Sequence, residues 1–202
     1  MKHINIKNND IELVTLLDAS SSMDWLENTV IKGFNIYIQD QKLERGNATI
    51  SLYKFSSRGR FKCIYYKEDV KNIKDISKNE YYTDGMTAMY DGIIETINNT
   101  HSKNVFMCIQ TDGDENASKH SSSDVKDLIL KKKKEGCKFL FLGTNINVKE
   151  SARKIGLEDS FYEFNNNSKG LEVAFAEMSR GASNYRASLD NNILLPKSYK
   201  RF

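Results

Sequence analysis

The chain has 202 residues, a length that fits one domain with one core, since domains typically hold about 100–200 residues. It carries 30 basic and 27 acidic side chains, and this near balance excludes the strongly basic composition typical of nucleic-acid-binding proteins. No stretch approaches the roughly 18 consecutive apolar residues of a membrane span, and the first residues lack the apolar core of a signal peptide. We therefore expect a cytoplasmic protein that binds neither nucleic acid nor membrane.

Apolar strand-like runs alternate with helix-like runs, a pattern that predicts an α/β domain with a mostly parallel sheet. A first strand is expected over 12–17, followed by helical spacing of apolar residues over 24–41. Strands are then expected over 48–55 and 61–66. The link between these two is too short for a parallel crossover, so the third strand should be antiparallel and lie at the sheet edge.

The second half of the chain continues this alternation after the turn at Gly85. Strands are expected over 105–110, 137–143 and 161–164. Helices are expected over 89–97, 123–135, 147–156 and from Ser168 to near Gly181. We assign 1–190 to one domain and 191–202 to a basic tail or edge-packing strap. The cysteines lie singly in apolar runs, so buried free thiols are expected at Cys63, Cys108 and Cys137.

The most informative segment follows the first apolar run directly. Asp18, Ser20 and Ser22 occupy alternate positions where this strand ends, so one carboxylate and two hydroxyls can turn toward one point. Mg²⁺ prefers near-octahedral oxygen ligation with several positions left to water, so the segment predicts a site for a hard divalent cation. Ser and Asp are also the commonest turn and helix-cap residues, which leaves a cap for the following helix as an alternative.

Two later segments place oxygen-bearing side chains in similar settings. Thr87 stands at a turn that opens a helical pattern, with an ordinary helix cap as its alternative, and Asp112 ends a second apolar strand. In order and context, the three segments resemble the metal-ion-dependent adhesion site of von Willebrand factor type A domains, especially of intracellular bacterial and phage members. The matching residues are Asp18, Ser20, Ser22, Thr87 and Asp112.

This resemblance covers about 12–164, and more loosely extends to 189. It implies a Rossmann-like fold with a six-stranded, mostly parallel sheet, one antiparallel edge strand and helices on both faces. The strand order would be third, second, first, fourth, fifth, sixth. The first and fourth strands are then neighbours at the topological switch point, where open α/β sheets place ligands. In the family the two serines are the direct ligands, whereas Asp18 and Asp112 often act through water or hydrogen bonds.

An ion held mainly by neutral oxygens keeps much of its charge and attracts a carboxylate from another molecule. The resemblance therefore implies a non-enzymatic module that depends on Mg²⁺, or on Mn²⁺ or Ca²⁺, and captures an Asp or Glu carboxylate of a protein partner. The alternatives are a metal-assisted phosphoester hydrolase and a structural phage or assembly protein with a purely structural ion. A hydrolase would need a base or a phosphate clamp, and the site segments contain no Lys, Arg or His. Aromatic or apolar side chains can line the rim or pack beneath the loops at Trp25, Tyr81, Tyr82 and Met86.

Overall fold

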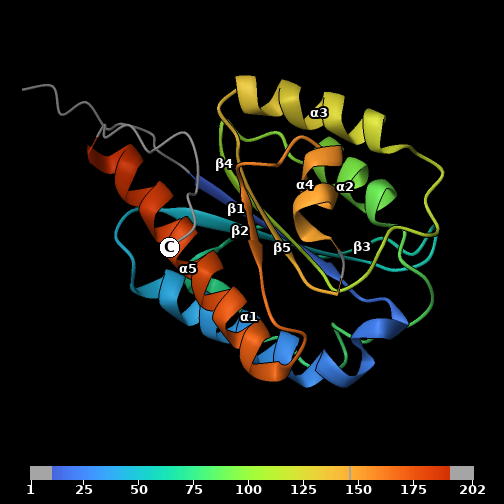
Figure 1. The fold of residues 1–202 in the computed structure, drawn as a ribbon. Coiled ribbons are helices and arrows are strands. Elements are labelled where there is room, and N and C mark those ends of the chain that lie inside the picture. The colour runs from blue at the N-terminus through green and yellow to red at the C-terminus, as the bar shows by residue number, and fades with distance from the viewer. Residues whose placement is uncertain (1–10, 146, 192–202) are drawn as a thin grey trace, which may run out of the picture.

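The computed structural model describes residues 11–145 and 147–191. Its centre is a six-stranded sheet in the order β3-β2-β1-β4-β5-β6 (Figure 1), which confirms the expected order. All neighbouring strands are parallel except β2 and β3, which are antiparallel. The strands are β1 (Ile11–Asp18), β2 (Ala48–Phe55), β3 (Lys62–Asp69), β4 (Asn104–Thr111), β5 (Lys138–Gly143) and β6 (Phe161–Glu163).

Helices cover both faces of the sheet, as expected (Figure 1). On one face α1 and α5 pack over a core that includes Leu13, Phe106 and Phe175, and on the other α2, α3 and α4 cover a second core that includes Val14 and Ile109. The α-helices are α1 (Glu27–Leu43), α2 (Met89–Asn98), α3 (Ser122–Lys134), α4 (Val148–Lys154) and α5 (Ser168–Asn191). Two short 3-10 helices are η1 (Ser21–Leu26) and η2 (Val70–Asn72).

The parallel register brings the polar ends of the central strands together. Every residue of β1 is buried, as expected for a parallel strand covered on both faces. In the ladder Asp18 lies opposite Phe55 of β2, and Leu17 lies opposite Gln110 of β4. The residues that follow β1 and β4 therefore leave the sheet at the same edge, at the switch point of the topology.

The last helix is longer than the sequence predicts. It was expected to end near Gly181, but α5 continues through this residue to Asn191. Arg186 explains the continuation, because its guanidinium is buried against the end of α1, where it donates to the carbonyl oxygens of Gln41, Arg45 and Gly46. Tertiary contacts of this kind override the local cost of a glycine in a helix. The tail expected over 191–202 lies, from residue 192 onward, outside the described residues.

One cysteine prediction is wrong. Cys108 and Cys137 are buried free thiols as expected, but Cys63 is exposed on the edge strand β3. An edge strand shields its side chains on fewer sides than a central one, so an apolar run there does not ensure burial. In the part of the chain that the structure describes, no helix combines the length and the apolar character needed to cross a bilayer.

Candidate metal site

The carboxylate of Asp18 lies buried at the end of β1 and is held by donors of the protein itself. One oxygen accepts the main-chain N–H of Ser20 at 2.8 Å, and the other accepts the hydroxyl of Thr111 at the end of β4. Burial raises the pKa of the Asp18 carboxyl to about 6, although both hydrogen bonds act in the opposite direction. Asp18 therefore joins the start of the loop after β1 to the end of β4 through its carboxylate.

The two serines turn their hydroxyls toward each other, with Ser20 Oγ and Ser22 Oγ 3.0 Å apart. Ser20 stands at the N-cap position of η1, but its side chain makes no capping hydrogen bond. A helix cap therefore does not account for the Ser20 hydroxyl, and this alternative is wrong for Ser20. Instead, the hydroxyls of Ser20 and Ser22 lie together just beyond the end of β1.

Asp112 supplies the second carboxylate, from the loop that follows β4. Its Oδ1 accepts the hydroxyl of Ser22 at 2.6 Å. Its Oδ2 is buried and has no hydrogen-bond partner among the described residues. Burial also raises the pKa of the Asp112 carboxyl above its usual range. A buried carboxylate oxygen without a donor is costly, and a cation in contact with it would remove that cost.

Thr87 approaches the same place from the loop before α2. The N-cap of α2 is Ala88, and the first-turn N–H groups of Tyr90 and Asp91 are accepted by side chains of the loop after β4 and not by Thr87, so the cap alternative for Thr87 is also wrong. Within the described residues the Thr87 hydroxyl makes no hydrogen bond. A Cβ added to Gly113 would lie 3.4 Å from Thr87 Oγ1 and 3.6 Å from Ser22 Oγ, so both hydroxyls border one small space.

Main-chain hydrogen bonds join the loop after β1 to the loop that carries Thr87. Ser21 N–H donates to the carbonyl of Gly85 at 3.0 Å, and Asp84 N–H donates to that of Ala19 at 2.8 Å. Gly85 has a φ of +71°, a conformation that favours glycine, so the turn requires this residue. Tyr81 is fully buried and donates its hydroxyl to the Asp18 carbonyl, so it supports the site and does not line the rim.

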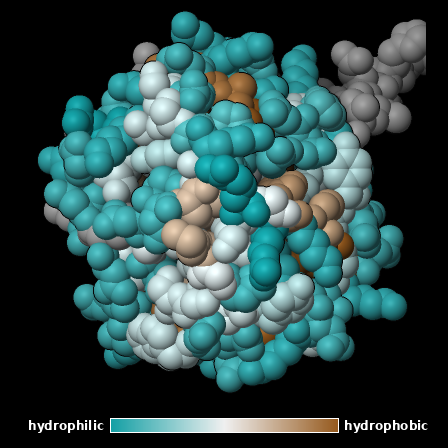
Figure 2. Space-filling view, turned by 90° about the vertical axis from the view of Figure 1, so that its right-hand side faces the viewer, coloured by the Kyte–Doolittle hydropathy of each residue, from teal (hydrophilic) through white to brown (hydrophobic). Residues whose placement is uncertain are grey.

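The rim of the site carries exposed apolar side chains. Trp25 is 54% exposed and Met86 53%, so neither is packed beneath the loops. Tyr82 is also half exposed, and its ring lies under the Lys54 ammonium. Figure 2 looks onto the side of the molecule toward which β1 and β4 point in Figure 1. Weakly polar and mildly hydrophobic residues gather near the centre of this face, within a hydrophilic surround.

Sequence reasoning missed residues that support the candidate ligands through hydrogen bonds. Thr111 holds the Asp18 carboxylate, and Asn116 holds the main chain of Thr87. Thr111 precedes Asp112 directly, so its position at the strand end was a usable signal. Nothing in the sequence indicates the contact of Asn116, because it depends on how the loop after β4 folds back onto α2.

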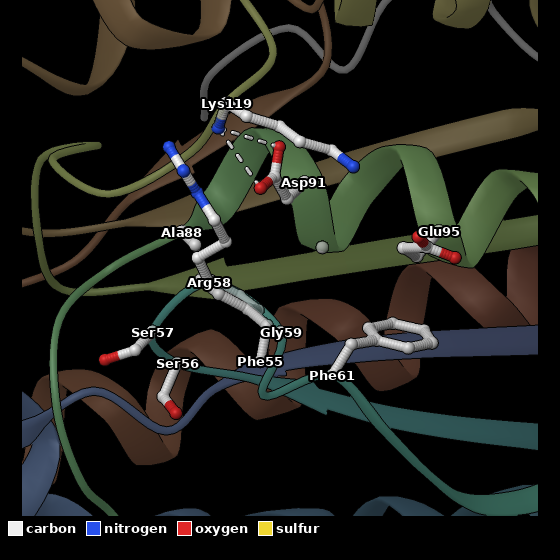
Figure 3. Close-up of a pocket in the computed structure, with 11 residues that line it drawn as sticks. Phe55, Ser56, Ser57, Arg58, Gly59, Phe61, Ala88, Asp91, Glu95 and Lys119 are labelled. Atoms are coloured by element: carbon white, nitrogen blue, oxygen red, sulfur yellow. Dashed lines mark hydrogen bonds between the residues drawn. The ribbon is translucent and has the colours of Figure 1, made fainter.

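A cavity of about 150 Å³ lies near the site, between the β2–β3 turn and the first turns of α2 (Figure 3). None of the five candidate ligands lines it. Arg58 and Lys119 supply cations to its wall, whereas the Asp91 carboxylate there already accepts the main-chain N–H groups of Lys119 and His120. The cavity is therefore separate from the cluster of hydroxyls.

The donor set fits a hard cation and not a soft one. Three hydroxyls and two carboxylates converge at Asp18, Ser20, Ser22, Thr87 and Asp112. The described part of the chain holds no group of three or more His, Cys, Asp or Glu side chains placed to bind a metal, which argues against a zinc-type His and Cys site there. Oxygen donors of this kind suit Mg²⁺, Mn²⁺ or Ca²⁺.

The model of the von Willebrand factor type A domain, abbreviated VWA, matches residues 12–177. The chain belongs to this family. No curated protein sequence matches this VWA domain.

Solved structures share the VWA fold at low sequence identity. A variant of the PilB minor pilin from Streptococcus sanguinis superposes with a TM-score of 0.66 at 17% identity, covering 90% of this chain and 63% of the pilin. The pilus adhesin SpaC from Lactobacillus rhamnosus GG, in an open conformation, gives a TM-score of 0.67 at 14% identity, covering 87% of this chain and 30% of the adhesin.

A third structure is the proximal thread matrix protein 1 from the mussel byssus, described with a zinc-occupied MIDAS motif, that is, a metal-ion-dependent adhesion site. It gives a TM-score of 0.63 at 17% identity and covers 86% of this chain. The match spans 46% of the byssus protein, so this VWA domain corresponds to less than two thirds of each of these three relatives. At such identities the likeness shows the fold alone.

Proposed function

We propose that this VWA domain is a divalent-cation-dependent protein-binding module, with the ion held by Asp18, Ser20, Ser22, Thr87 and Asp112. The observation that carries the proposal is the buried, unpartnered Oδ2 of Asp112 beside a group of hydroxyls. An ion at this place would pair the orphaned oxygen and offset the burial of two carboxylates. Mg²⁺ is the expected ion, with Mn²⁺ and Ca²⁺ as alternatives.

The ion would keep much of its charge at this site. The Asp18 carboxylate is engaged on both oxygens by protein donors, and one oxygen of Asp112 is engaged by Ser22. Neutral hydroxyls thus make up most of the donor set. A cation that is only partly neutralised attracts an anionic group into an open coordination position, and an Asp or Glu carboxylate of a protein partner supplies one.

The exposed side chains at the rim indicate which kind of partner residue would lie beside the acidic one. Trp25 and Met86 are both more than half exposed, and they belong to the two loops joined by the hydrogen bond from Ser21 to Gly85. Exposed aromatic and methionine side chains are favoured as contact anchors in protein interfaces. We therefore propose that the partner segment places a large apolar residue beside its acidic one.

We propose a binding role and not an enzymatic one. No Lys, Arg or His side chain of the described residues forms a hydrogen bond or ion pair with the candidate ligands. A phosphoester hydrolase would need such a group as base or clamp, and the cations Arg58 and Lys119 line a separate cavity. Phosphatase and nuclease assays with Mn²⁺ test this: turnover that disappears in Asp112→Ala would favour the hydrolase.

The binding proposal is tested with a displayed random-peptide library panned on the immobilised chain in Mg²⁺ and in chelator. We expect Mg²⁺-dependent enrichment of peptides with an acidic residue next to a large apolar one. Thr87→Ala should abolish their binding, whereas Thr29→Ala, a hydroxyl removed from the surface of α1, should not. Trp25→Ala should weaken it, whereas Tyr66→Ala, an exposed aromatic on β3, should not. Peptides that bind equally in chelator would contradict the proposal.

A further inference from the structure

The main chain of Thr87 is held on both sides by one residue of another loop. Thr87 N–H donates to Oδ1 of Asn116 at 2.9 Å, and Asn116 N–H donates back to the Thr87 carbonyl at 3.1 Å. Thr87 is 3% exposed, so water cannot readily replace these bonds. Two bonds of opposite direction fix the peptide units before and after Thr87, and therefore the direction of its Cα–Cβ bond.

The pairing joins the two loops that carry Thr87 and Asp112. Asn116 lies four residues beyond Asp112 in the loop after β4, while Thr87 lies two residues after Gly85. The backbone before Thr87 is held at Gly85, whose carbonyl accepts the N–H of Ser21, and at Met86, whose N–H donates to Ser57 Oγ, but neither bond reaches Thr87 itself. Asn116 holds the main chain directly at Thr87, the residue whose hydroxyl borders the metal site.

We propose that Asn116 is a positioning residue that sets the Thr87 hydroxyl for the ion, an inference that rests on the proposed metal site. Mg²⁺ tolerates little deviation from octahedral geometry, so a ligand on a loose loop loses affinity. Residues that orient a metal ligand typically change metal affinity by about 10–100-fold when they are removed. Asn116 itself does not touch the space between the hydroxyls; it acts through the backbone of Thr87.

The same loop provides a matched control. Ser118 Oγ accepts the main-chain N–H of Asp91 at 3.0 Å, in the first turn of α2. This bond has the same form as the one from Thr87 to Asn116, a side-chain oxygen accepting a main-chain N–H across the same two segments. It does not involve Thr87. If Asn116→Ala lowers the Mg²⁺ affinity only because the loop after β4 is less firmly attached, Ser118→Ala should lower it as well.

The test is Mg²⁺ calorimetry on the wild-type chain, Asn116→Ala, Ser118→Ala and Asn116→Asp, with urea midpoints measured in chelator. We expect Asn116→Ala to raise the Kd for Mg²⁺ at least tenfold and Ser118→Ala to change it less than twofold. Both variants should lower the urea midpoint by similar amounts. Asn116→Asp keeps the acceptor and should restore binding. In chelator, the Thr87 amide should exchange its hydrogen faster in Asn116→Ala alone.

The outcomes separate this inference from the proposed function. Mg²⁺ binding at wild-type affinity in Asn116→Ala, or an equal loss in Ser118→Ala, would overturn the role of Asn116 and leave the metal site standing. A wild-type chain that binds no Mg²⁺ would overturn both. Failure of Asn116→Asp to recover affinity would show that the hydrogen bond to Thr87 is not the cause.

Discussion

Replacing Asp18 by Asn should stabilise the metal-free protein. Burial raises the pKa of the Asp18 carboxyl from 3.8 to about 6, a difference of roughly two pH units. At 1.36 kcal/mol per unit, the ionised carboxylate costs the metal-free fold about 3 kcal/mol near neutral pH. An Asn has the same shape without the charge. Its oxygen can accept the N–H of Ser20, and its amide can donate to Thr111, whose own proton can turn to the Gly113 carbonyl.

The sign of the pH dependence follows from the raised pKa. The folded chain keeps the Asp18 proton to higher pH than the unfolded chain, so this group lowers the stability as the pH rises from about 4 to 6, with little further change above. Asp18→Asn should lack this slope. With Mg²⁺ at about 100 times its Kd, the wild type should gain about 2.7 kcal/mol, and the variant should gain less because it lacks the Asp18 charge.

The assay is urea unfolding in chelator at several pH values, with Asp24→Asn as the control because Asp24 is an exposed acid of the adjacent η1. At pH 7 we expect the free energy of unfolding to rise by up to about 3 kcal/mol in Asp18→Asn and to stay nearly unchanged in Asp24→Asn. A metal-free Asp18→Asn that is less stable than the wild type at pH 7 would refute the reasoning. So would a variant that retains the full Mg²⁺-induced gain of the wild type.

Other regions of the fold give further predictions. Gly113→Ala places a methyl group 3.4 Å from Thr87 Oγ1, in the space that both hydroxyls border, and calorimetry should show Mg²⁺ affinity at least tenfold weaker with an unchanged circular dichroism spectrum. Arg186→Met leaves carbonyls at the end of α1 without their donor, so urea unfolding should show the free energy of unfolding lowered by about 3 kcal/mol while Mg²⁺ affinity stays unchanged. The hydrogen bond from Lys78 lowers the pKa of Glu27, so this pair adds stability that is lost as the pH falls below about 4.5. Lys78→Ala should flatten that part of a stability-against-pH curve, and an unchanged slope would count against the pairing.

The parts of the fold that the sequence predicts are those with strong local patterns. β1 and β5 are apolar runs buried on both faces, and their ends are marked by Asp18 and Gly143. Because neighbouring parallel strands end at the same edge of a sheet, the sequence alone predicts that the polar residues after β1 and β4 lie close together. The short link after β2 indicated the antiparallel edge strand, although β3 runs on to Asp69.

The features that escaped prediction depend on contacts between distant segments. The continuation of α5 past Gly181 depends on the burial of Arg186 at the end of α1. The exposure of Cys63 follows from its place on an edge strand; the sequence predicted the edge position of 61–66, but its apolar run favoured burial of the thiol. The hydrogen bonds between Asn116 and Thr87 form only because two loops meet, and the local sequence around neither residue predicts this contact.

The central claim is that one divalent ion binds where the loops after β1 and β4 meet the loop before α2. The most direct test is an anomalous difference map from a crystal soaked in Mn²⁺. The account predicts that the strongest peak lies within bonding distance of the Ser20, Ser22 and Thr87 hydroxyls, and that it is missing from crystals of Asp112→Ala. A strongest peak elsewhere in the molecule, or an equal peak in that variant, would contradict it.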